Sequence, residues 1–144
     1  MLETCIREAT EQDHNFIYNS FLKSLHGTSI YSLITSSTFF QKMHDWLEQK
    51  LKTQKCYIIC SPDDDFFILG WIVGTPIELS YVYVKEKYRR NDLAAKLLEH
   101  LLGNTDKPYR VECNLMTLSG WNLLDHIMSH KYPLLQFIYV PPKF

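Results

Sequence analysis

The segment from residue 78 to residue 103 constrains the fold more than any other part of the sequence. It begins with a β-prone run, Glu78–Val84, and continues through a short basic turn, Lys85–Asn91. Apolar residues then recur at helical spacing until Gly103, a residue typical of a helix C-terminus. The segment therefore predicts a strand, a tight turn and a helix over Asp92–Leu102. Along the strand, the alternation predicts one face with Leu79, Tyr81 and Tyr83 and the other with Ser80, Val82 and Val84.

The N-terminal half predicts a strand followed by two amphipathic helices. The strand covers Thr4–Ala9, and Thr10 is the expected N-cap of the first helix. That helix has apolar residues at helical spacing and ends near Gly27. The second helix is expected to begin near Ser37 or Thr38, and its apolar face continues to Leu51.

The rest of the chain predicts four further elements around the central segment. A hairpin joins 56–60 to 66–73 through Ser61–Asp65, a strong turn signal, and Gly74–Pro76 is expected to break the second strand. After Gly103 a strand over 109–115, a helix over 118–130 and a strand over 134–140 are expected. The order β-α-α-β-β-β-α-β-α-β indicates an α/β domain with a mixed, mostly antiparallel sheet flanked by helices.

This order, together with the turn into the leucine-rich helix, resembles the GNAT (Gcn5-related N-acetyltransferase) superfamily. The family pattern at this turn is [Arg/Gln]-x-x-Gly-x-[Gly/Ala], and Arg89, Leu93 and Ala94 fit it. Asp92 stands where the family usually has its first glycine. The resemblance covers nearly the whole chain, which is expected to form one GNAT-like domain over residues 1–144.

The resemblance implies an acetyl-CoA site in the turn Tyr88–Ala94. A tight turn into a helix offers unpaired backbone N–H groups and the positive end of the helix dipole, which together attract a diphosphate. In the family, backbone groups of the preceding strand pair with the pantetheine amides. The implied cofactor-binding residues are Tyr83, Val84, Arg89, Arg90, Asn91, Asp92, Leu93 and Ala94.

Asp92 supports a second interpretation of the same turn. Its carboxylate is expected to cap the helix, to occupy the N–H groups that a phosphate needs, and to repel a diphosphate. An aspartate-capped helix after a solvated basic turn explains these residues as well as a cofactor site does.

The resemblance also implies two catalytic residues. Glu78, at the start of the strand that leads to the turn, corresponds to the glutamate that often serves as the base. The helix tyrosine that often serves as the acid falls near Ile127, so His126 is the expected acid, with Tyr132 as a substitute. A solvated carboxylate and a surface histidine are the alternatives.

Composition excludes several classes of function. The formal net charge of −1 gives no sign of bulk nucleic-acid binding, and no apolar run is long enough to cross a bilayer. Histidine spacing offers no metal motif, so no metal ligand is expected. Cys5, Cys56, Cys60 and Cys113 form no C-x-x-C pair and indicate reduced, buried thiols in a cytoplasmic protein.

Two functions follow from the resemblance. The first is an acetyl-CoA-dependent N-acyltransferase that acts on an unidentified amine. The second is a non-catalytic interaction protein of the same fold. Three segments, 16–20, 70–73 and 81–85, also resemble small GNAT-like proteins of tailed phages. That narrower resemblance implies virion or host proteins as partners, and the virion or the host cytoplasm as the location.

Overall fold

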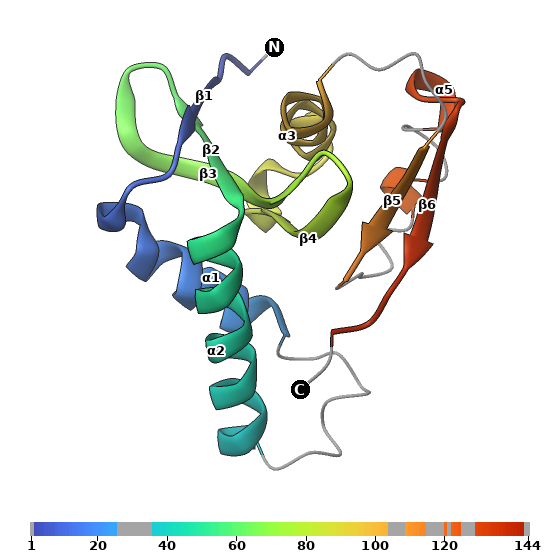
Figure 1. The fold of residues 1–144 in the computed structure, drawn as a ribbon. Helices are drawn as coiled ribbons and strands as arrows, with labels where there is room; N and C mark the ends of the chain where they lie inside the picture. Colours follow the sequence, from blue (N-terminus) through green and yellow to red (C-terminus); the bar gives the residue numbers. More distant parts are fainter. Residues whose placement is uncertain are drawn as a thin grey trace.

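A six-stranded sheet organises the chain, with its strands in sequence order from β1 to β6 (Figure 1). The computed structural model describes residues 2–25, 36–103, 109–114, 120, 122–124 and 129–142. The strands are β1 (Cys5–Glu8), β2 (Lys55–Ser61), β3 (Asp64–Thr75), β4 (Glu78–Val84), β5 (Tyr109–Cys113) and β6 (Leu135–Tyr139). The mixed α/β fold class predicted from the sequence is confirmed.

Three long helices, α1 (His14–Leu25), α2 (Ser36–Thr53) and α3 (Leu93–Leu102), lie where the amphipathic patterns predicted helices, whereas η3 (Glu86–Tyr88) forms within the expected turn. Further helical segments are η1 (Glu11–Asp13) and α5 (Ser129–Lys131). Gly103 ends α3 with φ 68°, a left-handed conformation that glycine adopts without steric cost. Gly27 and most of the helix expected over 118–130 lie outside the described residues, although residues 120 and 122–124 are helical.

Pairing changes from antiparallel to parallel along the sheet. The β1–β2, β2–β3 and β3–β4 pairs are antiparallel, whereas β4–β5 and β5–β6 are parallel. The connection between the parallel strands β4 and β5 contains α3, because a crossover between parallel strands usually includes a helix. Contrary to the expected break at Gly74–Pro76, β3 continues through Gly74 and Thr75, because these residues still pair with Leu79 and Glu78.

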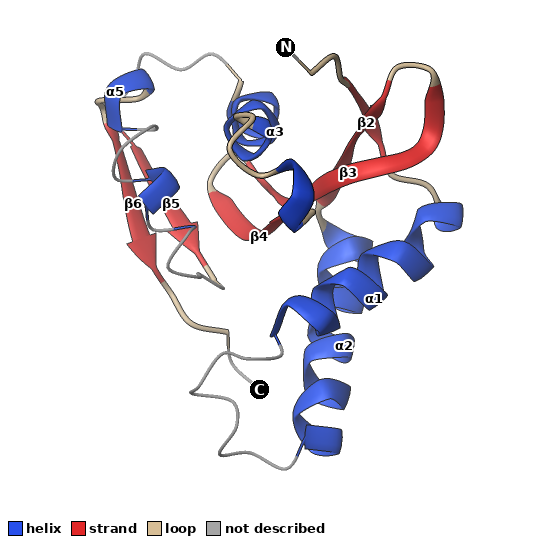
Figure 2. Ribbon diagram, turned by 180° about the vertical axis from the view of Figure 1, so that it is seen from behind, coloured by secondary structure: helices blue, strands red, loops and turns tan. Residues whose placement is uncertain are grey.

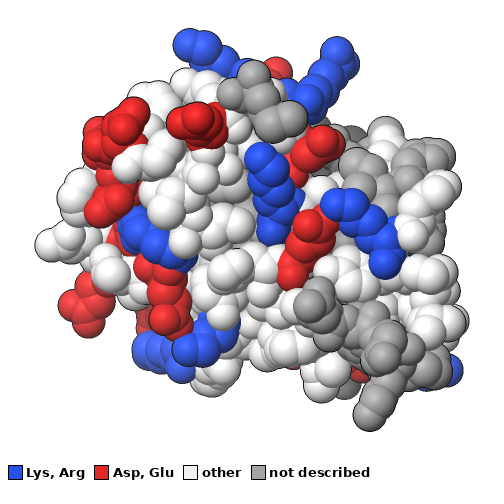
Figure 3. All heavy atoms as spheres, turned by 90° about the horizontal axis from the view of Figure 1, so that it is seen from above, with Lys and Arg blue, Asp and Glu red and all other residues white. Residues whose placement is uncertain are grey.

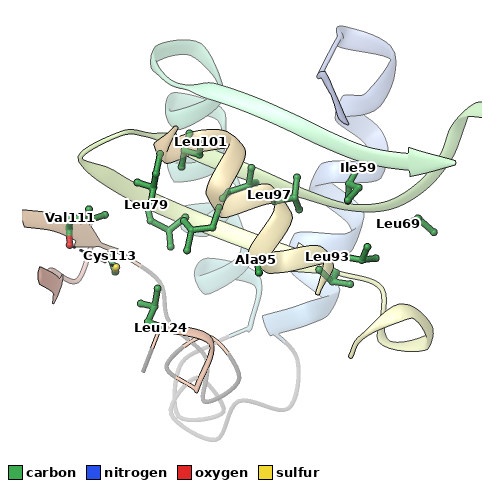
Figure 4. Close-up of a cluster of buried hydrophobic side chains, with 14 residues drawn as sticks. Ile59, Leu69, Leu79, Leu93, Ala95, Leu97, Leu101, Val111, Cys113 and Leu124 are labelled. Atoms are coloured by element: carbon green, nitrogen blue, oxygen red, sulfur yellow. Dashed lines mark hydrogen bonds between the residues drawn. The ribbon is translucent and has the colours of Figure 1, made fainter. Parts of the chain in front are cut away.

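Helices cover both faces of the antiparallel strands (Figure 2). On one face, α1 and α2 pack their apolar stripes on Trp71 and its neighbours. On the other face, α3 packs Leu93, Leu97 and Leu101 on the sheet (Figure 4). This second core extends to Val111 and Cys113 of β5, so that α3 fills the space between β4 and β5.

A β-bulge at Ser80 divides β4 into two parts. Val73 pairs with Tyr81 and Gly74 pairs with Leu79, so Ser80 has no partner residue on β3. An extra residue reverses which side chains face which side of the sheet. Leu79 therefore shares the α3 face with Val82 and Val84, whereas Tyr81 and Tyr83 face α1 and α2. The uninterrupted alternation predicted from the sequence is wrong for this reason.

Candidate functional site

The turn between β4 and α3 has an unusual backbone. After η3, Arg89 is extended, and both Arg90 (φ 72°) and Asp92 (φ 58°) are left-handed. Left-handed residues other than glycine are uncommon, although aspartate tolerates this region better than most residues. Such strained residues cluster at functional sites, so the turn is a candidate site on conformation alone.

The N-terminus of α3 faces this turn with its backbone donors available. The first intrahelical bond runs from the N–H of Lys96 to the carbonyl of Asp92, at 3.0 Å. The N–H groups of Leu93, Ala94 and Ala95 precede it and have no acceptor within the helix. Leu93 and Ala95 are buried, which anchors the helix terminus on the sheet. An anion beside the turn would meet these donors and the positive end of the dipole.

Arg89 and Asn91 hold the turn in shape. Nε of Arg89 donates to the carbonyl oxygen of Val84 at 3.1 Å. Nδ2 of Asn91 donates to the carbonyl oxygen of Tyr88 at 3.0 Å. Both contacts tie the turn to the end of β4 or to itself, while Arg90 is exposed on its outer side. Arg89 therefore supports the turn as well as adding charge to it.

The bulge also decides which backbone groups of β4 face away from β3. The N–H of Lys85 donates to Leu69 on β3, at 2.8 Å. Alternation then directs the backbone groups of Tyr83 toward β3 and those of Val82 and Val84 toward the opposite edge. The contact from Arg89 to the Val84 carbonyl agrees with this direction. Sequence reasoning missed Val82, because the bulge changes the alternation.

β5 separates from β4 beyond the bulge at Ser80. The two strands pair only at Glu78–Glu112 and Leu79–Cys113, and the N–H of Asn114 donates to the Leu79 carbonyl at 3.0 Å. Figure 1 shows β5 and β6 diverging from β4 beyond this point. The two strands are parallel, and beyond the bulge they enclose a V-shaped opening. It leaves the edge of Val82 and Val84 without a strand partner among the described residues.

A polar network lies where the strands separate. Glu78 accepts hydrogen bonds at Oε1 from Nζ of Lys50 (2.7 Å) and at Oε2 from Nε2 of Gln54 (3.0 Å). The buried hydroxyl of Ser80 lies 2.6 Å from Oε1 of Gln54 and 3.2 Å from Oδ1 of Asn114. Buried polar groups of this kind are costly unless they are paired, so the network favours this one arrangement of the strands.

Comparison with solved structures identifies the fold of this chain. No family model matches the sequence, and no curated protein matches it. A similar solved structure is that of a possible acetyltransferase from Clostridium difficile 630, 16% identical, with TM-score 0.60 over 98% of this chain and 96% of that one. The GCN5-related N-acetyltransferase from Rhodopseudomonas palustris is 18% identical, with TM-score 0.50 over 72% of this chain and 68% of that one. The chain has the GNAT fold.

A third similar structure is the apo form of YjaB from Escherichia coli. It is 13% identical, with TM-score 0.53, and the match covers 70% of this chain and 65% of that one. At these identities, the similarity establishes the fold.

Asp92 is the residue that the sequence pattern matched to the first glycine of the family's turn. Its left-handed backbone is the conformation for which glycine is usually needed. The expectation that its carboxylate caps α3 is wrong, because no side-chain cap hydrogen bond forms. N-cap residues normally have an extended backbone, from which the side chain reaches back to the helix, and Asp92 does not have one. The N–H groups of the helix terminus therefore stay open.

The structure describes one of the two expected catalytic residues. Glu78 lies at the closed end of the V, partly buried and held by Lys50 and Gln54. His126 lies outside the described residues. The hydroxyl of Tyr132 donates to the Gly103 carbonyl at 3.0 Å, which places it at the C-terminal end of α3, away from the turn. That position does not suit Tyr132 as a substitute acid at the turn.

The cysteines do not form a second reactive centre in the described residues. Cys56, Cys60 and Cys113 are buried, as expected, but Cys5 is exposed, because β1 is an edge strand and Cys5 lies at its first position. Burial raises the pKa of Cys56 and of Cys113 to about 12, which keeps both thiols protonated. In the same part of the chain, no group of three metal-binding side chains occurs.

Surface charge shows no extended basic region on the face seen from above. Figure 3 shows lysine and arginine side chains interspersed with aspartate and glutamate. This pattern differs from the basic stripe that nucleic-acid binding usually requires. None of the helices in the described ranges combines the length and apolar character that a bilayer crossing needs.

Proposed function

We propose that this protein binds an acyl-CoA, with acetyl-CoA as the expected donor, and transfers the acyl group to an amine. The observation that carries the proposal is the left-handed Asp92 at the N-terminus of α3. This conformation turns the chain sharply and leaves the first N–H groups of the helix without a side-chain cap. They lie beside the edge of β4 at Val82 and Val84, which has no strand partner among the described residues. A diphosphate fits the N–H groups at the start of α3, and an extended pantetheine arm fits the edge of β4.

In this proposal, each cofactor-binding residue has a defined part. The N–H groups of Leu93 and Ala94 bind the diphosphate, and Arg90 adds a positive charge to it. Asn91 and Arg89 keep the turn in shape, while Asp92 supplies the left-handed bend. The pantetheine amides pair with the edge of β4 at Val84, and also at Val82. Tyr83 contributes the packing of its ring against Phe16 and Trp71.

The chemistry requires a base and an acid. The amine nitrogen attacks the thioester carbonyl carbon, a C–N bond forms and the C–S bond breaks. Glu78 takes the proton that the amine loses, directly or through water, and His126 protonates the leaving thiolate. Glu78 is held by Lys50 and Gln54, and each of its oxygens can accept a further hydrogen bond.

The second candidate function is a GNAT-fold interaction protein without catalysis. Two observations favour it. Asp92 places a negative charge beside the open N–H groups, and both oxygens of Glu78 are already engaged by protein donors. In this case the exposed arginines would contact acidic partner surfaces, in a virion or a host protein if the chain is phage-encoded. The soluble host cytoplasm or the virion would be its location, with residues 1–144 acting as one domain.

Titration with acetyl-CoA separates the two functions. Isothermal titration of the wild-type protein is expected to show binding, and the melting temperature is expected to rise with ligand. At 100 times the dissociation constant, a bound ligand adds about 2.7 kcal/mol to stability. If millimolar acetyl-CoA produces neither signal, the acyltransferase proposal fails and the interaction protein remains.

Thiol release then tests the catalytic residues. Wild type, Glu78→Gln and His126→Gln are compared with acetyl-CoA and a panel of primary amines, including polyamines and lysine peptides. Both variants are expected to lose at least about 100-fold in kcat while they keep acetyl-CoA affinity. If Glu78→Gln retains the wild-type rate, Glu78 is not the base.

A further inference from the structure

Two aromatic side chains form an exposed corner directly before the candidate cofactor turn. Phe67 of β3 is 44% exposed, although it is a large apolar residue. Its ring centroid lies 6.1 Å from that of Tyr88 in η3, with the planes at 78°. Tyr88 packs partly against the α3 core, so one side of its ring is fixed while the corner stays open to solvent.

Hydrogen bonds join Tyr88 of the corner to the turn. The N–H of Tyr88 donates to the Lys85 carbonyl at 2.9 Å, and the Tyr88 carbonyl accepts from Nδ2 of Asn91 at 3.0 Å. Tyr88 is thus bonded to the start of the turn and to the residue before Asp92. A ligand group held at the α3 terminus would have its neighbouring atoms beside these rings.

Lysines surround the two rings. Nζ of Lys85 lies 5.3 Å from the Phe67 ring centroid and 5.2 Å from that of Phe16. Nζ of Lys87 lies 5.9 Å from the Tyr88 centroid, and Lys87 is exposed. Lys85 therefore covers one face of Phe67, whereas Lys87 is free to turn toward an anion beside Tyr88. Planar aromatic faces with adjacent cations suit a ligand that joins a heteroaromatic base to phosphates.

We propose that the Phe67–Tyr88 corner binds the adenine base of the acyl-CoA donor, with Lys87 directed at the phosphate on its ribose. The inference rests on the proposed function, because the diphosphate at the α3 terminus links the base to the pantetheine arm. Exposed aromatic residues beside a binding turn often mark a contact surface. A free adenine nucleotide has the same chemistry, so the experiment includes one.

Phe66 provides a matched control. It is adjacent to Phe67, is also a phenylalanine and is more exposed, at 65%. Neighbouring residues of a strand point to opposite faces, so Phe66 points away from the face that Phe67 shares with Tyr88. Truncating Phe66 removes the same type of side chain without touching the corner.

The experiment compares two donors by isothermal titration. One is acetyl-CoA, and the other is acetyl-4′-phosphopantetheine, which keeps the thioester, the pantetheine and one phosphate but lacks the 3′-phosphorylated adenosine monophosphate. Wild type, Phe67→Ala, Phe67→Leu and Phe66→Ala are titrated with both donors and with ADP, and melting curves verify folding. Phe67→Ala and Phe67→Leu are expected to weaken acetyl-CoA binding about tenfold, because stacking is lost. Neither variant should change the affinity for acetyl-4′-phosphopantetheine, and Phe66→Ala should change neither affinity.

Every other outcome would overturn the inference, and each outcome points to a different cause. Equal weakening of both donors by Phe67→Ala would mean that the ring only supports the turn. Unchanged acetyl-CoA affinity in both Phe67 variants would place the adenine elsewhere and leave the proposed function intact. Binding of ADP as tight as that of acetyl-CoA would assign the corner to a free nucleotide. No binding of either donor by the wild type would remove the proposed function, and the inference with it.

Discussion

Arg89 donates a hydrogen bond from Nε to the carbonyl oxygen of Val84, at 3.1 Å, and so closes the turn onto the end of β4. The contact joins the two parts of the candidate site, the edge of the strand and the N-terminus of α3. It also leaves the two Nη groups of the guanidinium to face solvent or a phosphate.

Replacing Arg89 should therefore weaken acetyl-CoA binding through both the geometry and the charge of the turn. Arg89→Ala is expected to raise the dissociation constant about tenfold or more, since a hydrogen bond to a charged partner contributes about 1.5–3 kcal/mol. Arg89→Gln keeps a donor near Val84 and should lose less. Isothermal titration at low and moderate salt measures both variants, and wild-type affinity should fall as salt rises.

The control for this prediction is Arg90→Gly. It removes a neighbouring charge at a left-handed residue without adding strain, because glycine adopts φ 72° freely. It should reduce the salt dependence of binding while leaving the turn intact. Equal affinity of wild type and Arg89→Ala would contradict the role given to Arg89.

Substitutions at Asp92 test the effect of its backbone conformation separately from the effect of its charge. Asp92→Gly should keep the left-handed turn, lose no helix cap and remove a negative charge, so acetyl-CoA binding should tighten. Asp92→Asn removes the charge alone and should reproduce most of this gain, because asparagine also tolerates φ 58°. Asp92→Val should lower the free energy of unfolding by about 1–2 kcal/mol, because of strain. Weaker binding in both Asp92→Gly and Asp92→Asn would mean that the carboxylate assists the ligand.

Gly70 is required by the close approach of β4. A Cβ atom at this position would lie 2.4 Å from the carbonyl oxygen of Tyr83 and 3.2 Å from Cα of Val84. Gly70→Ala is therefore expected to lower the free energy of unfolding by about 1–3 kcal/mol, as overpacking does. It should also displace the strand edge that leads to the turn. Urea denaturation and acetyl-CoA titration measure the two effects, with Gly103→Ala as a comparison in open space, where only the left-handed backbone is strained.

Asp13 should make the fold sensitive to acid. Its buried carboxylate accepts hydrogen bonds from the Arg7 guanidinium at 2.7 and 2.8 Å. These bonds, with one from the backbone of Thr10, hold the pKa of Asp13 below its ordinary value despite burial. A carboxyl whose folded pKa is lowered stabilises the fold above its unfolded pKa, and this stabilisation is lost as pH falls through the folded pKa.

The free energy of unfolding should consequently decrease as pH falls below about 4. Asp13→Asn should lower stability by about 2–4 kcal/mol at pH 7, because Arg7 then lacks its charged partner, and should show a smaller change with pH. Glu11→Gln, an exposed neighbour in the same turn, is the control and should change stability little. Urea denaturation between pH 3 and pH 7 measures all three proteins. An Asp13→Asn variant as stable as wild type would contradict this account.

The sequence alone determined the order of the elements and the position of the turn. Helical spacing in α3, the turn at Ser61–Asp65 and the strand Glu78–Val84 are local patterns, and local patterns depend on neighbours in the chain. The resemblance of this turn to the GNAT pattern, rather than spacing alone, singled out Arg89 and Asp92.

Only the tertiary structure decided how these parts meet. The bulge at Ser80 depends on the register between β3 and β4, and it changed which side chains and which backbone groups face the site. The ion pair of Glu78 with Lys50 joins residues on different elements, so no local pattern contains it. Asp92 adopts a left-handed backbone in the fold and makes no side-chain cap hydrogen bond to the helix that follows it. Long-range register and packing set these features, because a short segment cannot specify its partners in space.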